Sequence, residues 1–149
     1  MRPRLTTLVA LGSLACGGGA GPGKPVPQSS PQETLAQFMA AVKANDLDRM
    51  SALWGNEHGP ASGRMKADEV RQRLSVLQIY LNHVSYRVVE GPLPVPNRDD
   101  RRTFRVELQR ATSCTVVVPL ELARAKANRW FVVGTDLASL SSPAQPCQH

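Results

Sequence analysis

The sequence contains few of the residues that build catalytic and metal centres. Its 149 residues include three histidines, three cysteines, two tryptophans and two tyrosines. His58, His83 and His149 are scattered, so they do not form the closely spaced ligand set of a zinc site. The chain also lacks a Gly-rich phosphate loop between a strand and a helix, and it lacks a nucleophile elbow. We therefore expect no metal, no cofactor and no catalytic constellation.

The chain has no apolar run long enough to cross a membrane, which takes about 20 residues. A shorter apolar run follows Arg2 and Arg4 and ends at the small residues Ser13 and Ala15. A secretory signal has three parts: a basic start, an apolar middle and small residues before the cleavage site. We interpret residues 1–15 as a signal peptide that exports the protein.

The residue directly after this signal is Cys16, so the segment resembles a bacterial lipoprotein signal. In that family the cysteine is acylated and becomes the mature N-terminus. Ser13 stands where the family prefers a large aliphatic residue, so plain cleavage after Ala15 stays an alternative. Gly17 is not the aspartate that retains lipoproteins at the inner membrane. The resemblance therefore implies a membrane anchor through Cys16, in the outer membrane and facing the periplasm.

The rest of the chain divides into a tether, one domain and a tail. Residues 16–29 are rich in glycine and proline, which cannot bury a core and behave as a tether. Residues 30–142 are enough for one hydrophobic core and not for two. Residues 143–149 lie beyond the domain as a C-terminal tail, and the whole stretch from Leu137 to His149 is expected to be held only if Cys147 is paired.

The charge balance is basic. The formal net charge is +6, and Arg2 and Arg4 leave with the signal, so the mature chain carries 6 − 2 = +4. A basic surface on a cytoplasmic protein suggests that it binds nucleic acid, but the predicted export of this chain argues against that partner. Acidic lipid headgroups or cell-wall polymers are alternatives, beside a mixed surface that faces only solvent.

The cysteines predict one disulfide. If Cys16 is acylated, Cys114 and Cys147 remain, an even number in an oxidising compartment. A bridge between them closes a loop of 147 − 114 = 33 residues. In the chain-entropy model such a loop is worth roughly 3–4 kcal/mol. The alternative is two free thiols, one buried and one at a frayed end.

The first half of the domain has helical patterns. Ser30-Pro31-Gln32-Glu33 is a capping box with proline at the first helical position. An apolar stripe at helical spacing follows, comprising Leu35, Phe38, Met39 and Val42. Asp46 can cap a second short helix with Leu47, Met50, Leu53 and Trp54 inward. A third helix is expected from about Asp68 to Asn82, with Gln78 toward solvent, and Gly55–Lys66 is expected to be a loop.

After Asn82 the apolar period changes to two, which is typical of strands. Four strands are expected, around 84–88, 104–108, 114–122 and 129–136. The residues we expect on their inward face are Phe104, Val106, Leu108, Val116, Val118, Leu120 and Leu122. Gly91–Arg102 is expected to be an extended, mobile hairpin loop. Pro119 should face an edge or a bulge, since proline cannot donate to a ladder.

Helices followed by antiparallel strands predict an α+β fold, with three N-terminal helices packed on a curved sheet. The pattern resembles the nuclear transport factor 2-like (NTF2-like) superfamily, with its SnoaL-like and lumazine-binding-like members. The resembling stretches are Pro31 to Leu53, where Ala44-Asn45-Asp46-Leu47 opens the second helix, and the closing strand Asn128 to Val133. Members often have a strand pair after the second helix, where this sequence indicates a loop.

The resemblance implies a cone-like sheet that can enclose a pocket, in which enzymes of the superfamily place an Asp, His or Tyr. The inward positions carry no carboxylate and no histidine, and Tyr86 is the one polar-tipped candidate. We predict a ligand pocket that involves four aromatic residues, although each could instead be plain core: Trp54, Tyr86, Phe104 and Trp130. Glu57 and His58 form a local pair on a Gly-rich loop and are not expected to act together. His83 is expected to serve as a cationic helix cap.

These observations predict a non-catalytic, lipid-anchored envelope protein that binds a small apolar ligand or a protein partner. One alternative is an isomerase- or dehydratase-type enzyme of the same fold. That would follow if a one-residue slip turned Arg87 and Val89 inward. The other alternative is a structural subunit of an envelope complex, with Gly91–Arg102 as its contact.

Overall fold

The computed structural model describes residues 28–145. The predicted signal peptide, Cys16, Cys147 and His149 lie outside these residues. The described chain contains the helices α1 (Pro31–Lys43), α2 (Leu47–Leu53) and α3 (Ala67–Leu81), then the long strands β3 (Ser85–Val95), β4 (Arg98–Gln109), β5 (Thr115–Ala125) and β6 (Arg129–Gly134). The predicted α+β class is confirmed.

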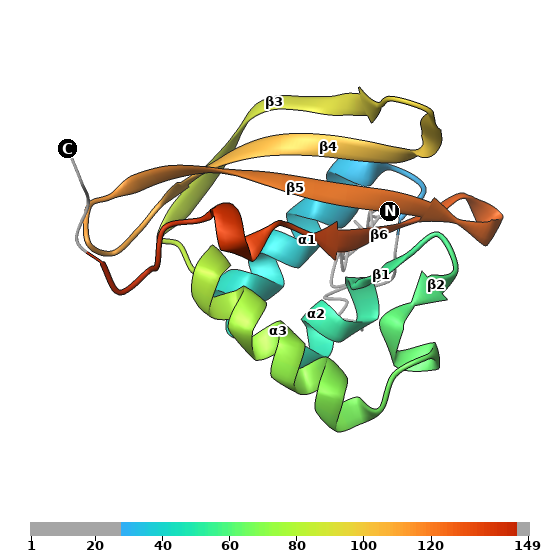
Figure 1. Ribbon diagram of the computed structural model, residues 1–149, viewed down its shortest axis with the longest axis horizontal. Helices are drawn as coiled ribbons and strands as arrows, with labels where there is room; N and C mark the ends of the chain where they lie inside the picture. The colour runs from blue at the N-terminus through green and yellow to red at the C-terminus, as the bar shows by residue number, and fades with distance from the viewer. Residues whose placement is uncertain (1–27, 146–149) are drawn as a thin grey trace, which may run out of the picture.

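The four long strands form one antiparallel sheet in the order β3-β4-β5-β6. The sheet twists over the helices, with α1 running beneath it and α2 and α3 below (Figure 1). Side chains on one sheet face therefore meet the apolar stripes of the helices. This arrangement is consistent with the cone-like architecture that the resemblance implied.

The helix starts agree with the sequence signals. The Ser30 hydroxyl accepts a hydrogen bond from the backbone N–H of Glu33 at 3.3 Å, and the Asp46 carboxylate accepts one from Arg49 at 3.0 Å. Such caps satisfy backbone donors that a helix leaves unpaired in its first turn. The third helix spans Ala67–Leu81, one residue earlier at each end than expected.

The core lies between the helices and the inward sheet face. Its fully buried side chains include Phe38, Met39 and Leu53 from the helices and Leu108, Leu120 and Leu122 from the sheet. The predicted inward residues of β4 and β5 are all buried, apart from Val116, which is half-buried against the same core. The alternation therefore predicted the buried face correctly.

The prediction of a loop at Gly55–Lys66 was wrong. A short hairpin forms there from β1 (Gly55–Asn56) and β2 (Gly59–Pro60), followed by the turn η1 (Ala61–Gly63). Strands of two residues are too short to show an apolar–polar alternation, so the sequence pattern could not indicate them. Gly55 is required, because a Cβ there would lie 2.3 Å from the carbonyl oxygen of Gly59.

The prediction of a mobile loop at Gly91–Arg102 was also wrong. β3 continues to Val95 and β4 begins at Arg98, which leaves only Pro96 and Asn97 in the turn. The prolines at 92 and 94 suggested a loop, but β3 is an edge strand whose outer side needs no donors. β3 keeps pairing with β4 through register shifts between Val88 and Val95.

Two further residues and the tail after β6 can be compared with their predictions. Pro119 was expected to face an edge or a bulge. It lies on the part of β5 that has no β6 neighbour, since β6 pairs with β5 only from Glu121 onward. Gln78 was expected in solvent, but it is buried and donates to the carbonyl of Val42 at 3.1 Å. The tail after β6 forms the turn η3 (Leu137–Ser139), and Leu137 and Leu140 pack on the core.

Candidate functional site

A groove of about 520 Å³ lies between α3 and the end of β6. Its lining is Trp54, Glu69, Gln72, Arg73, Val76, Leu77, Val133, Gly134, Thr135 and Leu137. The volume lies within the range of small-molecule sites, and such sites are mostly apolar with a few polar groups. Five of these residues present apolar or aromatic surface, so the groove suits a small, largely apolar molecule.

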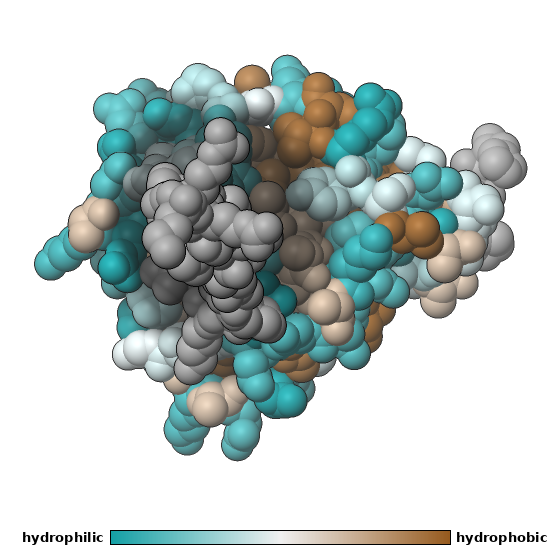
Figure 2. Space-filling view, turned by 180° about the vertical axis from the view of Figure 1, so that it is seen from behind, coloured by the Kyte–Doolittle hydropathy of each residue, from teal (hydrophilic) through white to brown (hydrophobic). Residues whose placement is uncertain are grey.

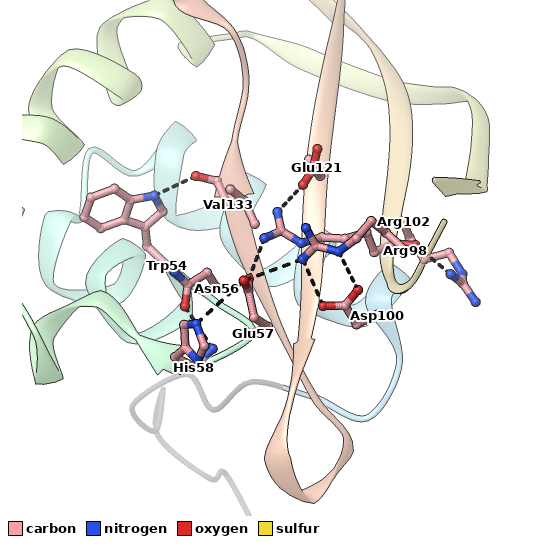
Figure 3. Close-up of polar contacts among 10 residues, drawn as sticks. Trp54, Asn56, Glu57, His58, Arg98, Asp100, Arg102, Glu121 and Val133 are labelled. Atoms are coloured by element: carbon pink, nitrogen blue, oxygen red, sulfur yellow. Dashed lines mark hydrogen bonds and ion pairs between the residues drawn. The ribbon is translucent and has the colours of Figure 1, made fainter. Parts of the chain in front are cut away.

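Trp54 forms one wall of the groove and is fixed in place. It directly follows α2, makes an isolated parallel bridge with Val132, and its indole N–H donates to the carbonyl of Val133 at 3.0 Å (Figure 3). With its N–H satisfied, the half-buried ring can offer apolar surface to a ligand.

The groove also has polar groups. The hydroxyl of Thr135 is buried and has no hydrogen-bond partner within residues 28–145. Buried polar groups are nearly always paired, so this hydroxyl offers hydrogen-bonding capacity beside the groove. On the α3 side, Arg73 and Glu69 form an i, i+4 ion pair at 2.8 Å. The site therefore combines apolar walls with polar groups on both its α3 side and its β6 side.

A second arrangement of polar groups lies at the β1–β2 turn, where Glu57 meets the sheet (Figure 3). The guanidinium of Arg101 lies between the carboxylates of Glu57, at 2.5 Å, and Glu121. Arg98 contacts Glu57 at 3.5 Å and binds Asp100 through two hydrogen bonds of 3.0 and 3.2 Å. This network joins the hairpin to β4 and β5.

The pKa of the Glu57 carboxyl is lowered in this network. A hydrogen bond from its own backbone has the largest effect, partial burial opposes it, and the charge of Arg101 lowers the pKa further. His58 lies 3.8 Å from the same carboxylate and is exposed. The carboxylate is thus ionised and held by arginines, as in a structural ion-pair network.

The structure separates the four aromatic residues that we predicted to line a pocket. Trp54 lies in the groove described above. Phe104 and Trp130 are buried in the core, and Tyr86 is half-buried against it. Their role in ligand binding stays a prediction. Thr135 was missed, because a single threonine after a strand carries no signal in the sequence.

His83 was expected to be a cationic cap, but its environment favours the neutral form. The ring is buried, and burial lowers its pKa, against the opposing effect of a 2.9 Å hydrogen bond to the carbonyl of Leu81. It meets Tyr86 edge-on at 5.4 Å between ring centroids. Burial also raises the pKa of Tyr86. The His83 imidazole and the Tyr86 hydroxyl are therefore two polar groups close together where β3 begins.

The register of β3 decides which of its residues face inward. Tyr86 and Val88 lie opposite the buried Leu108 and Val106, whereas Arg87 lies opposite Glu107 and binds it at 2.6 Å. The slip that would turn Arg87 inward is therefore not present.

Part of the inward face at β3 stays open, since Val88 is 44% exposed. Figure 2 shows apolar surface near the centre and toward the upper right of the rear face, with hydrophilic side chains along its outer border.

Cys114 lies just before β5 and is half-buried. Its predicted partner is outside the described residues, so the Cys114–Cys147 disulfide stays a prediction. Within residues 28–145, no cluster of three or more His, Cys, Asp or Glu is placed to hold a metal ion. No helix in the same range is long and apolar enough to cross a bilayer.

Comparisons with known proteins give one likeness. No family model matches the chain, and no curated protein matches it. The crystal structure of a protein from Campylobacter jejuni, described as an NTF2-like transpeptidase, aligns over 70% of this chain and 98% of its own, with 16% identity and a TM-score of 0.46. A likeness at this level says nothing about activity.

Proposed function

We propose that this chain is a non-catalytic, exported envelope protein that binds a small apolar ligand in the groove between α3 and β6. The observation that carries the proposal is the groove itself, with the fixed ring of Trp54 on one side and beside it the Thr135 hydroxyl, which has no hydrogen-bond partner among residues 28–145. Apolar walls supply affinity, and one or two polar groups orient the ligand. A protein partner is the alternative occupant.

The proposal includes the anchor. The signal over residues 1–15 exports the chain, and acylated Cys16 holds it in the outer membrane on the periplasmic side. Several acyl chains on one cysteine suffice for stable attachment, whereas one chain gives only marginal binding.

Binding can be tested with the neutral apolar dye N-phenyl-1-naphthylamine, whose fluorescence rises in apolar sites. Val76→Arg places a charge in the groove, and burying it beside a ligand is costly. We expect at least about a tenfold loss of dye affinity, which corresponds to roughly 1.4 kcal/mol. The matched control is Ile79→Arg, on the same helix and exposed but outside the groove lining. Equal affinity for both variants and the parent would contradict the proposal.

The anchor is tested separately by the intact mass of the mature protein from its native cell. We expect a chain that begins at acylated Cys16. A soluble chain that retains Met1 would refute the anchor without affecting the groove.

A further inference from the structure

The basic side chains of this domain differ in whether they form ion pairs. Six of the twelve arginines in residues 28–145 are paired with carboxylates, namely Arg71, Arg73, Arg87, Arg98, Arg101 and Arg105. By contrast, Arg124, Lys126 and Arg129 are exposed and form no ion pair within the described part of the chain. These three lie within six residues, at the end of β5, in the turn η2 (Lys126–Asn128) and at the start of β6.

A fourth cation, Arg102, joins them. The guanidinium groups of Arg102 and Arg124 each lie 5.7 Å from the ring centroid of Trp130. The contact holds both guanidinium groups in place without neutralising them. Arg102 also donates to two backbone carbonyls, those of Asp99 at 3.1 Å and Arg101 at 2.6 Å. We call Arg102, Arg124, Lys126 and Arg129 the basic tip.

The acidic groups near the basic tip are mostly engaged elsewhere. Glu57 and Glu121 are bound to Arg101, and Asp100 is bound to Arg98. Asp99 is the acid at this end that forms no ion pair within residues 28–145. The four cations therefore leave a net positive end, which attracts anionic surfaces.

The turn presents its cations outward. Ala127 and Asn128 both adopt left-handed backbone angles, with φ of 57° and 54°. Such angles close a tight hairpin, so the flanking Lys126 and Arg129 come together at its end. Both residues line a groove of about 430 Å³ with His58 of the β1–β2 turn, and the buried Phe131 also contributes to its lining.

The N-terminal end of the domain lies beside the basic tip. The backbone N–H of Trp130 donates to the carbonyl of Gln28 at 3.0 Å, so the chain enters the domain next to β6. Cys16 precedes Gln28 by 28 − 16 = 12 residues. Twelve residues cannot reach more than roughly 40 Å even when fully extended. An anchor at Cys16 therefore holds this end of the domain closest to the bilayer.

We propose that the basic tip binds the anionic phospholipid surface of the membrane that holds the anchor. This inference rests on the proposed lipid anchor, which decides which end of the domain faces the bilayer. The tip supplies four cations, and each Lys or Arg near an anionic surface adds to the attraction. Contact at the tip turns α3 and the groove beside β6 away from the headgroups, since α3 begins and ends away from the β5–β6 turn (Figure 1).

The test uses the mature chain, residues 16–149, carrying Cys16→Ser, so that neither acylation nor the signal peptide plays a part in the result. Binding is measured by co-sedimentation with vesicles of phosphatidylglycerol and phosphatidylethanolamine, and with vesicles of phosphatidylcholine alone. Lys126→Gln with Arg129→Gln removes two cations of the tip. The matched control is Lys43→Gln with Lys66→Gln, at the end of α1 and before α3. It removes two exposed cations that form no ion pair within the described residues.

We expect the tip pair to weaken partitioning onto anionic vesicles by at least about tenfold, since each cation near such a surface contributes roughly fivefold. The control pair should change it by less than about threefold, and rising salt should reduce the difference. Equal losses for the two pairs, or equal binding of the parent to both kinds of vesicle, would overturn the inference. Because Cys16 is absent from this test, failure of the anchor would appear only in the intact mass.

Discussion

Replacing Arg101 by methionine should destabilise the domain more than any exposed arginine replacement. Arg101 is only 12% exposed, and its guanidinium lies between the carboxylates of Glu57 and Glu121. Methionine keeps much of the volume and removes the charge. The two carboxylates then lose the cation between them, and the hairpin at Glu57 loses its main contact with β4.

The size of the effect follows from burial. Removing one member of a buried ion pair typically costs about 3–5 kcal/mol. The carboxylates here are 28% and 39% exposed, so water can partly replace the lost cation. We therefore expect a loss of about 2–3 kcal/mol. Arg87→Met removes an equally well-formed contact with Glu107, but Arg87 is 70% exposed, so water screens that pair and its loss should change stability much less.

Urea unfolding followed by tryptophan fluorescence measures this difference. With a denaturant slope of about 1–3 kcal/mol/M, the Arg101 variant should unfold at a urea concentration lower by roughly 1–2 M. If Arg101→Met and Arg87→Met had the same free energy of unfolding, the network would not be joining the hairpin to the sheet.

The pH dependence of Glu57 gives a second measurement of the same network. Its folded pKa is lowered, so its ionised form stabilises the fold above the unfolded value of about 4.3. This contribution is lost as the pH falls through the folded pKa. The stability difference between the parent and Glu57→Gln should therefore shrink below about pH 4. A difference that stayed constant from pH 7 to pH 3 would contradict this account.

Three other results are expected. Because burial lowers the folded pKa of His83, the unfolded chain takes up a proton more readily, so stability should fall as the pH drops below about 6.5, and His83→Asn should flatten that decline in urea titrations. Phe104→Ala should cost about 3–5 kcal/mol in the same assay, because the ring is 1% exposed, and a loss under about 1 kcal/mol would show that the core can close around the cavity. Unreduced, denatured mature protein should show no titratable thiol, whereas two would refute the pairing of Cys114 with Cys147.

The sequence alone determined where the first two helices begin and which face of the sheet is buried. The capping box at Ser30 and the cap at Asp46 depend on residues three positions apart, so neighbours in the chain settle them. The alternation from Phe104 to Leu122 predicted the core correctly, because successive side chains of a strand point to opposite faces. A period of two or 3.6 reports which residues share a face.

Periodicity does not report which other element a face packs against. The tertiary structure therefore decided which residues form the groove and which distant polar groups pair. Trp54, Val76 and Thr135 come from three separate segments, and only packing brings them to one groove. The contact of Glu57 with Arg101 spans 44 positions, and the burial of Gln78 depends on a carbonyl 36 positions away. Contacts at such separations depend on where whole elements pack, which no local pattern encodes.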